Sequence, residues 1–317
     1  MKTITVSRVK TSRWKVAVLA LVVGVGGCGS GDQADAAAGA KLAVVATTPE
    51  VADFVRNIGA DAVTVTQIIK PNVDPHEYEP TPADIRAIGA AELVVKNGVG
   101  LEAWLDQTIE SSGFRGTVVD ASQGVTLREG GHEEGEGEQH DPHIWHSPLN
   151  AKIMVADIEK GLAAADPSQA ATFASNLTAY SAKLDKLDAD NEAAFATLPA
   201  AQRKLVTNHD AFGYYVDRYR LEFVGSVIPS LDTSAELSAQ QLNDLVARIK
   251  TTGAKAVFTE SSLPPKTAEA IAKQAGVKVV GGEDSLYGDS LGEPGTPQGT
   301  YLGAEAHNTE VIVTALQ

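Results

Sequence analysis

Short runs rich in β-branched residues recur at eight places along the chain and alternate with helical patterns. The runs are Leu42–Thr47, Val63–Ile69, Leu93–Lys96, Thr117–Asp120, Lys204–Thr207, Phe223–Ile228, Ala256–Thr259 and Val277–Val280. Helical patterns lie between most of them, as at Thr81–Gly89, Leu101–Ser111, Ala239–Lys250 and Thr267–Ala275. Strands that alternate with helices favour parallel sheets flanked by helices. The sequence therefore predicts an α/β fold of two lobes, each with a roughly four-stranded, mainly parallel sheet.

The middle of the chain, residues 166–198, predicts one long rigid α-helix that joins the lobes. Asp166 is suited to cap it, with Pro167 at its first position. Apolar residues then recur at alternating spacings of four and three, at Phe173, Leu177, Tyr180, Leu184 and Leu187. A coiled-coil seam has a similar stripe, but this one is short and lies midway along the chain, which favours a helix packed across two lobes. The lobes would then be residues 40–165 and residues 199–317.

The first 27 residues have the pattern of a targeting segment and are excluded from the fold. Five Lys or Arg residues precede an apolar stretch of 12 residues, Val16–Gly27, and about 20 residues are needed to span a bilayer. Cys28 follows Gly26-Gly27, which resembles a bacterial lipoprotein signal, in which such a cysteine is lipidated. The alternative is an ordinary signal peptide and a free thiol, but the small residues before Cys28 favour lipidation. Residues 28–39 would then be a flexible tether that holds the protein extracytoplasmically, on the periplasmic or cell-surface side.

The body of the chain is strongly acidic. The whole sequence has a formal net charge of −15, and beyond residue 27 there are 21 basic and 41 acidic residues. This balance argues against nucleic acid as a partner and is compatible with attraction of cations. Residues 129–140 form a low-complexity segment of glycines, glutamates and two histidines. We expect this acidic segment to be a mobile loop, either without a role of its own or collecting cations.

Two copies of one tripeptide suggest a metal site. Asp74-Pro75-His76 and Asp141-Pro142-His143 each follow a predicted strand, His209 ends the fifth, and Asp284 follows the last. Ligands in open α/β sheets collect beyond the carboxyl ends of the strands. Three imidazoles and one carboxylate form a ligand set that Zn²⁺ accepts. The sequence predicts a metal ion held between the lobes by His76, His143, His209 and Asp284.

Other residues near these positions compete for a place in or around the site. His146 and His140 are alternatives to His143, although the repeated tripeptide favours His143 and makes His146 more suited to the rim. Glu283 is the rival of Asp284. Glu260 ends the seventh strand and is expected to orient a ligand rather than to bind the metal. The residues held as second-shell groups or alternate ligands are His146, Glu260, Glu77, Glu283 and His140.

These motifs together resemble those of the solute-binding lipoproteins of bacterial ABC importers for zinc and manganese, most closely the zinc-uptake branch. The resemblance covers about residues 40–317. It is carried by the segments 74–80, 141–145, 208–214, 258–260 and 284–286. It implies two α/β lobes joined by a long rigid helix, with the metal bound in the cleft by His76, His143, His209 and Asp284. His146 departs from the family, where an apolar residue is common, and the acidic segment has fewer histidines than the loops of some zinc-specific members.

The ligand types predict zinc rather than manganese. Imidazole suits Zn²⁺ and carboxylate-rich sites favour Mn²⁺, and the position of His209 tends to be a carboxylate in the manganese binders of the family. A ligand histidine must be neutral, so binding should weaken below about pH 6. We therefore expect a monomeric zinc-binding protein, not an enzyme, that delivers Zn²⁺ to the permease of an ABC importer.

Three alternatives to this function have to be weighed. The first is a manganese-binding homologue of the same transport class. The second is a zinc-dependent hydrolase, but catalytic zinc usually keeps an open position, and no His-Glu-x-x-His sequence is present. The third is a cell-adhesion protein, because some relatives were first described in that way, but nothing in the sequence marks an adhesive face.

Overall fold

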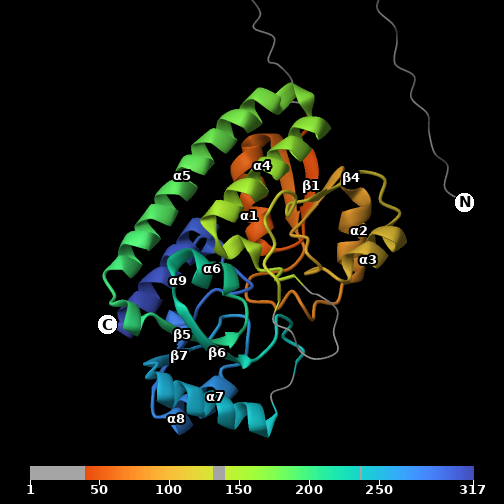
Figure 1. Ribbon diagram of the computed structural model, residues 1–317. Coiled ribbons are helices and arrows are strands. Elements are labelled where there is room, and N and C mark those ends of the chain that lie inside the picture. Colours follow the sequence, from red (N-terminus) through yellow and green to blue (C-terminus); the bar gives the residue numbers. More distant parts are fainter. Residues whose placement is uncertain (1–39, 131–139, 236–237) are drawn as a thin grey trace, which may run out of the picture. The chain divides into compact units, whose positions relative to one another are not determined.

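The computed structural model describes residues 40–130, 140–235 and 238–317, and residues 41–317 form one compact unit (Figure 1). The predicted signal peptide, Cys28 and the tether lie outside the described residues, as do residues 131–139 of the acidic segment. Six 3-10 helices accompany the longer elements in this part of the chain: η1 Ala60–Ala62, η2 Ile144–His146, η3 Pro167–Gln169, η4 Ala200–Gln202, η5 Gly282–Asp284 and η6 Pro297–Gly299. None of the helices in the described ranges is long and apolar enough to span a membrane.

The first lobe is built on a four-stranded parallel sheet. Its strands are β1 Leu42–Ala46, β2 Val63–Gln67, β3 Leu93–Lys96 and β4 Thr117–Asp120, in the order β2-β1-β3-β4. Its helices are α1 Pro49–Gly59, α2 Pro82–Ala90, α3 Leu105–Ser112 and α4 Pro148–Ala165. Because side chains alternate along a strand, Val44 and Ala46 enter one core with α1 and α4, while Val45 enters a second core with α2 and α3. Both faces of the sheet are thus covered by helices.

The long helix α5, Ala170–Ala196, runs from one lobe to the other, as the apolar stripe predicts. It is preceded by η3, and Asp166 caps η3 by accepting a hydrogen bond from the amide of Ser168 at 3.1 Å. Phe173, Tyr180, Leu184 and Leu187 lie in the core of the first lobe, and Phe195 lies in a core of the second. The helix therefore contributes to both cores, which confirms the predicted fold class.

The second lobe has four parallel strands that form two hydrogen-bonded pairs. They are β5 Lys204–His209 with β6 Glu222–Ile228, and β7 Ala256–Phe258 with β8 Lys278–Val280. Its helices include α6 Gly213–Tyr219, α7 Ala239–Thr252 and α8 Lys266–Ala275. Leu205 and Phe258 enter a core with α6, whereas Val206 and Val257 face α7 and α8. The same alternation as in the first lobe therefore places helices on both faces of these strands.

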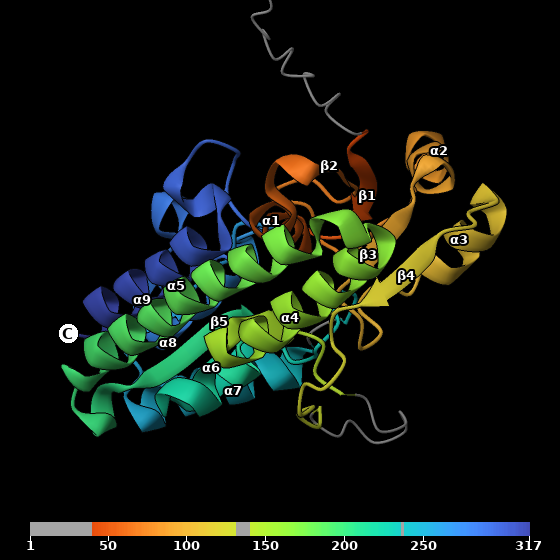
Figure 2. The same cartoon turned by 90° about the horizontal axis from the view of Figure 1, so that it is seen from above.

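The last helix, α9 Tyr301–Leu316, also joins the two lobes. Its first residue, Tyr301, lies in the core of the first lobe, and Ile312 and Leu316 lie in a core of the second. The amide of Tyr301 donates to Oδ2 of Asp53 on α1 at 3.0 Å. Helix α9 packs beside α5 (Figure 2). The chain passes between the lobes through the single long helix α5, as the sequence predicts, and α9 adds a second helix that packs against both lobes.

Candidate metal site

The first Asp-Pro-His copy forms a turn in the loop after β2. Oδ1 of Asp74 accepts the amide hydrogen of His76 at 2.9 Å. Oδ2 of the same carboxylate accepts a hydrogen bond from Thr233 in the second lobe at 2.6 Å. The aspartate of the motif thus fixes the backbone at His76 and ties its loop to the opposite lobe.

The second copy repeats this turn and adds a contact to the imidazole ring. Oδ1 of Asp141 lies 3.0 Å from the amide nitrogen of His143 and 2.8 Å from its Nδ1. Oδ2 lies 3.5 Å from Nη1 of Arg128. Because Asp141 engages Nδ1, Nε2 of His143 is left to face the site, the arrangement usual for a histidine that binds a metal.

His209 is the last residue of β5, and Glu260 holds it from β7. Oε1 of Glu260 accepts the amide hydrogen of His209 at 3.0 Å, and Oε2 lies 2.8 Å from its Nδ1. Glu260 thus contacts both the backbone and the ring of His209. As with His143, only Nε2 of His209 remains free to bind a cation.

Three imidazole nitrogens and the carboxylate of Asp289 converge on one point. Nε2 of His143 lies 3.2 Å from Nε2 of His76 and 3.4 Å from Nε2 of His209. The oxygens of Asp289 lie 3.0 Å from Nε2 of His209 and 3.3 Å from those of His76 and His143. Donors of a tetrahedral zinc site, each about 2.0–2.1 Å from the ion, stand about 3.3 Å apart. Five of the six separations among the four groups are close to this value, and one donor atom from each of the four residues lies within 4.8 Å of the others.

The converging groups are buried and incompletely hydrogen-bonded. The side chains of His143, His209 and Asp289 are fully buried, and His76 is 5% exposed. Within the described residues, neither carboxylate oxygen of Asp289 has a hydrogen-bond partner. A buried carboxylate without donors is costly unless a positive charge compensates it. The arrangement therefore fits a bound cation.

The electrostatics of the cluster show how the metal-free protein meets this cost. Burial lowers the pKa of His143, but Asp289 and Asp141 outweigh burial and raise the pKa to about 9. Burial lowers the pKa of His209 as well, and Asp289 and Glu260 hold it well above its usual value. Burial raises the pKa of Asp289, whereas His209, His143 and His76 hold it well below its usual value. Protons on His143 and His209 thus compensate the carboxylate at neutral pH, and an incoming cation must expel them.

Asp289, not Asp284, is the carboxylate that the structure places among the imidazoles. The prediction took the first acidic pair after β8, but Glu283 and Asp284 lie in η5 and are exposed. Asp284 lines a separate cavity of about 390 Å³ together with His307. After η5 the chain pairs once more with the segment that follows β7, through a parallel bridge between Leu286 and Glu260. Only after this bridge does the chain reach the site. Leu286, a buried apolar residue beyond the turn, is the sequence signal that marks this later strand end.

The remaining candidates lie outside the converging group. His146 is buried, its Nδ1 lies 2.8 Å from Oε1 of Glu305 on α9, and its ring stacks on Phe212 with centroids 4.4 Å apart. Glu77 and His140 are exposed. His146 is not among the donors that converge, and it lies in the packing between η2 and α9 rather than at the rim that the sequence suggested.

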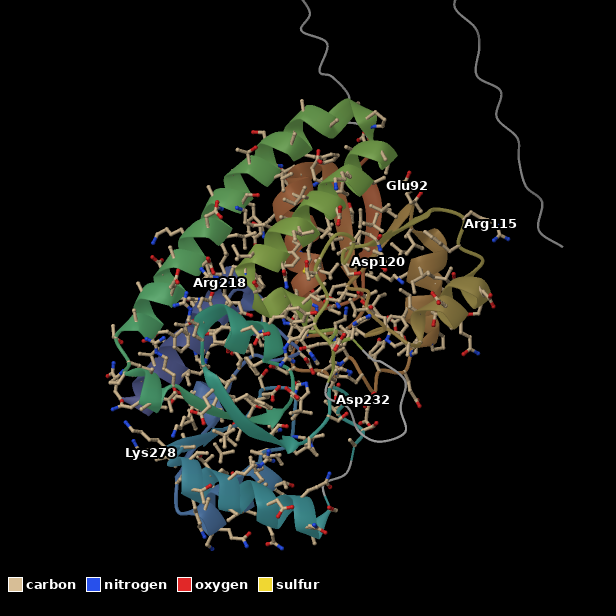
Figure 3. The ribbon with its side chains drawn as sticks, in the orientation of Figure 1. Glu92, Arg115, Asp120, Arg218, Asp232 and Lys278 are labelled. Carbon is tan, nitrogen blue, oxygen red and sulfur yellow. The ribbon has the colours of Figure 1, made fainter. Side chains whose placement is uncertain are left out.

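A cavity of about 460 Å³ opens beside His76. His140 and Pro142 line it from the first lobe, and Leu231 and Asp232 line it from the second. Asp232 lies on the loop that follows β6 (Figure 3). His76, the one partly exposed member of the converging group, therefore lies between this cavity and the buried side chains of the cluster.

Comparison with known proteins identifies the family. The family described as "Zinc-uptake complex component A periplasmic" matches residues 44–315. The chain belongs to this family. Members of the zinc-uptake family and its manganese-binding relatives are substrate-binding proteins of ABC importers and not enzymes, which confirms the predicted class of protein.

Individual relatives cover most of the chain. The zinc-binding protein TroA of Treponema pallidum is 37% identical over 286 residues, which are 89% of this chain and 91% of TroA. The manganese-binding lipoprotein MntA of Bacillus subtilis is 34% identical over 305 residues, which are 95% of this chain and 98% of MntA. The solved structure of periplasmic TroA has a TM-score of 0.81 at 33% identity and covers 87% of this chain and 99% of that chain. The zinc-uptake family thus includes close relatives named for each of two metals.

Proposed function

We propose that the protein captures Zn²⁺ at the carboxyl ends of its strands, with His76, His143, His209 and Asp289 as ligands. The observation that carries this proposal is the convergence of three Nε2 atoms and one carboxylate, with one donor atom from each residue within 4.8 Å of the others. Three imidazoles and a single carboxylate form the kind of donor set that suits zinc better than manganese. The family membership supports delivery of the ion to the permease of an ABC importer.

The second candidate is a manganese-binding role in the same transport class. It is favoured by the 34% identity to MntA of Bacillus subtilis, a protein named for manganese. Both oxygens of Asp289 face the imidazoles, so the carboxylate has the freedom to contribute two oxygens to an ion of higher coordination number. A nitrogen-rich set nevertheless binds Zn²⁺ more tightly than Mn²⁺ on intrinsic affinity.

A competition titration separates these two candidates. The protein purified from residue 28 onward is stripped of metal and titrated with Zn²⁺ and Mn²⁺ against a chromophoric chelator. We expect one tightly bound Zn²⁺ per chain and weaker binding of Mn²⁺. A His209→Ala variant should lose most of the zinc affinity, because it removes one of four ligands. Tighter binding of Mn²⁺ than of Zn²⁺ would favour the manganese role.

We further propose that Cys28 is lipidated and anchors the protein to the outer face of the cell membrane. The proposal is supported by the small residues before Cys28 and by relatives that are named lipoproteins, such as MntA. Replacement of Cys28 by alanine should release the protein from the membrane fraction of cells that express the full chain. Equal membrane retention of the wild-type and C28A proteins would contradict the anchor.

A further inference from the structure

The segment Gly288–Ser290 contacts both histidine-bearing loops of the opposite lobe. The carbonyl oxygen of Gly288 accepts a hydrogen bond from Nε1 of Trp145 at 3.1 Å, and Trp145 lies two residues after His143. Oγ of Ser290 accepts a hydrogen bond from the amide of Asn72 at 2.6 Å, at the start of the loop that carries His76. Asp289 lies between these two contacts. The neighbours of the carboxylate ligand on either side are therefore bound to the loops of two imidazole ligands.

The same segment is also fixed from within its own lobe. The amide of Leu286 donates to the carbonyl oxygen of Thr259 at 2.8 Å, and the amide of Ser261 donates to that of Leu286 at 2.9 Å. Gly288 has no side chain to displace Glu260: a Cβ atom there would lie 2.0 Å from Oε2 of Glu260. Glu260 in turn holds His209. The backbone around Asp289 is thus tied to the segments of all three imidazoles.

The nearest polar groups around the Asp289 carboxylate are the three imidazoles, at 3.0–3.3 Å. Within the described part of the chain, neither oxygen of Asp289 accepts a hydrogen bond. The bonds made by the carbonyl of Gly288 and the hydroxyl of Ser290 therefore fix the backbone at Asp289 independently of these charged contacts. Ser290 is 1% exposed although its donor Asn72 lies at the surface, and the bond from Trp145 is buried. Hydrogen bonds are stronger in such surroundings than in water.

We propose that Trp145 and Ser290 are positioning residues that hold the Asp289 carboxylate against the three imidazoles before a cation arrives. This inference rests on the proposed metal site. We call the two hydrogen bonds, from Trp145 to Gly288 and from Asn72 to Ser290, the interlobe clasp. The clasp removes conformational freedom from the fourth ligand, so that less entropy is lost when the ion binds. It also links release of the ion to separation of the lobes, since moving them apart breaks both bonds and withdraws Asp289.

Trp145 is itself firmly placed. Its carbonyl oxygen accepts a hydrogen bond from the hydroxyl of Tyr301 on α9 at 2.6 Å. Its ring meets that of His143 edge to face, with centroids 5.4 Å apart. A Trp145→Phe variant keeps an aromatic ring and the backbone contact but loses the indole N–H. This substitution therefore isolates the clasp bond from most of the packing.

The chain offers a matched control in Trp104. Its indole nitrogen is buried and has no hydrogen-bond partner within the described residues, and its ring packs on Tyr78. Trp104→Phe thus removes an equivalent indole N–H group that donates no hydrogen bond within the described residues. Ser290→Ala is a second, independent test, because it breaks the other bond of the clasp without touching an aromatic residue.

The test uses Co²⁺ as a spectroscopic probe in place of zinc. The purified wild-type protein and the three variants are loaded with Co²⁺, the visible absorption spectrum is recorded, and the release of the ion into excess chelator is timed. We expect W145F and S290A to release Co²⁺ about tenfold faster than wild type, in line with the loss of groups that orient metal ligands. Their visible bands should change in intensity, because the position of Asp289 changes. W104F should match wild type in both readouts.

A merely structural role of the clasp would lower the melting temperatures of W145F and S290A but leave the spectrum and the release rate as in wild type. That result would overturn the inference while leaving the proposed function intact. Wild-type protein that binds neither Co²⁺ nor Zn²⁺ would refute the proposed metal site itself, and the role of the clasp with it.

Discussion

In both Asp-Pro-His copies, the aspartate fixes the backbone of the histidine that faces the site. In each copy the aspartate accepts the amide hydrogen of the histidine two residues later. Asp141 also engages Nδ1 of His143, and Glu260 does the same for His209. A carboxylate behind the imidazole fixes the ring and makes Nε2 a better donor to a metal. The ligand set thus depends on acidic residues that do not themselves point into the site.

The identity of the fourth ligand can be tested by a pair of variants. Asp289→Ala should lower the affinity for Zn²⁺ by more than about 100-fold, because changes to the groups that only orient ligands already cost about 10- to 100-fold. Asp284→Ala, in exposed η5, should bind zinc within about twofold of wild type. Competition with a chromophoric chelator measures both. A large loss in D284A with normal binding by D289A would restore the assignment made from the sequence.

These two aspartates also show what a sequence can reveal about a site. His76 and His143 are recognisable because a local motif is repeated, and His209 because it directly ends a strand. Asp289 is five residues beyond Asp284, and its place depends on Leu286 pairing with Glu260 and on Gly288 passing close to that glutamate. Such contacts between distant segments leave only a weak local pattern. The proposed roles of Trp145 and Ser290 cannot be recognised from the sequence for the same reason, since each residue is hydrogen-bonded to a residue of the opposite lobe.

The affinity for zinc should rise steeply with pH. In the metal-free protein the pKa of His143 is raised to about 9, and the pKa of His209 is held well above its usual value. Zinc must therefore displace about two protons near pH 7, so that its affinity increases up to about 100-fold per pH unit. This extends the pH dependence well above the limit of about pH 6 expected from an unperturbed histidine. Titration calorimetry in buffers of different ionisation enthalpy counts the released protons.

Unlike the affinity for zinc, the folding stability of the metal-free protein should fall as the pH rises. Because the pKa of His143 is higher in the folded state, its contribution to the free energy of unfolding of the metal-free protein is complete below about pH 6.5, the pKa of histidine in the unfolded chain. That contribution is lost as the pH rises through about 9. For the preceding prediction on zinc affinity, an affinity that stays constant between pH 6.5 and 9 would contradict the protonation of His143 and His209 in the metal-free protein.

At the scale of elements, strands and most helices are where the hydrophobic pattern predicts them. The predicted runs at residues 93–96 and 117–120 coincide with β3 and β4, because alternate side chains enter cores on the two faces of the sheet. The packing of α9 against both lobes was not predicted from the sequence. Its sequence is a helical pattern like any other, and only the contacts of Tyr301 with Asp53 and Trp145 show that it reaches the first lobe.

Helix α1 begins with a buried acid that makes a clear pH prediction. Burial raises the pKa of Glu50 to about 8, and its Oε1 has no hydrogen-bond partner within the described residues. In the unfolded chain Glu50 loses this proton near its ordinary pKa of 4.5, so the free energy of unfolding falls as the pH rises from there towards 8. The slope for one such group is at most about 1.4 kcal/mol per pH unit. Glu50→Gln should therefore flatten the stability profile between about pH 5 and 6.5, below the range in which the histidines contribute.

Glu102 provides the control for this prediction. It is equally buried, but its carboxylate accepts hydrogen bonds from Thr47, Asn97 and Gly98 at 2.6–3.1 Å. An amide cannot accept all three, so Glu102→Gln should lower the stability throughout the same pH range. Urea unfolding at several pH values measures both variants. A profile of E50Q as steep as that of wild type would show that Glu50 is ionised in the folded protein.

At the scale of the whole molecule, the metal ion would join two lobes that α5 and α9 already connect. His76 and His143 come from the first lobe, and His209 and Asp289 come from the second. A ligand that binds only the folded state stabilises it, by about 4 kcal/mol when its concentration is 1,000 times the dissociation constant. Zinc should therefore raise the melting temperature of wild type by several degrees, measured by calorimetry, and leave that of D289A nearly unchanged. An equal rise in both proteins would place the stabilising ion elsewhere.

Anomalous diffraction from crystals of the zinc-loaded protein, recorded on both sides of the zinc edge, tests the central claim most directly. We predict one strong peak about 2.0–2.2 Å from Nε2 of His76, His143 and His209 and from a carboxylate oxygen of Asp289. A peak bound by Asp284, or no peak among the three imidazoles, would contradict the proposed site.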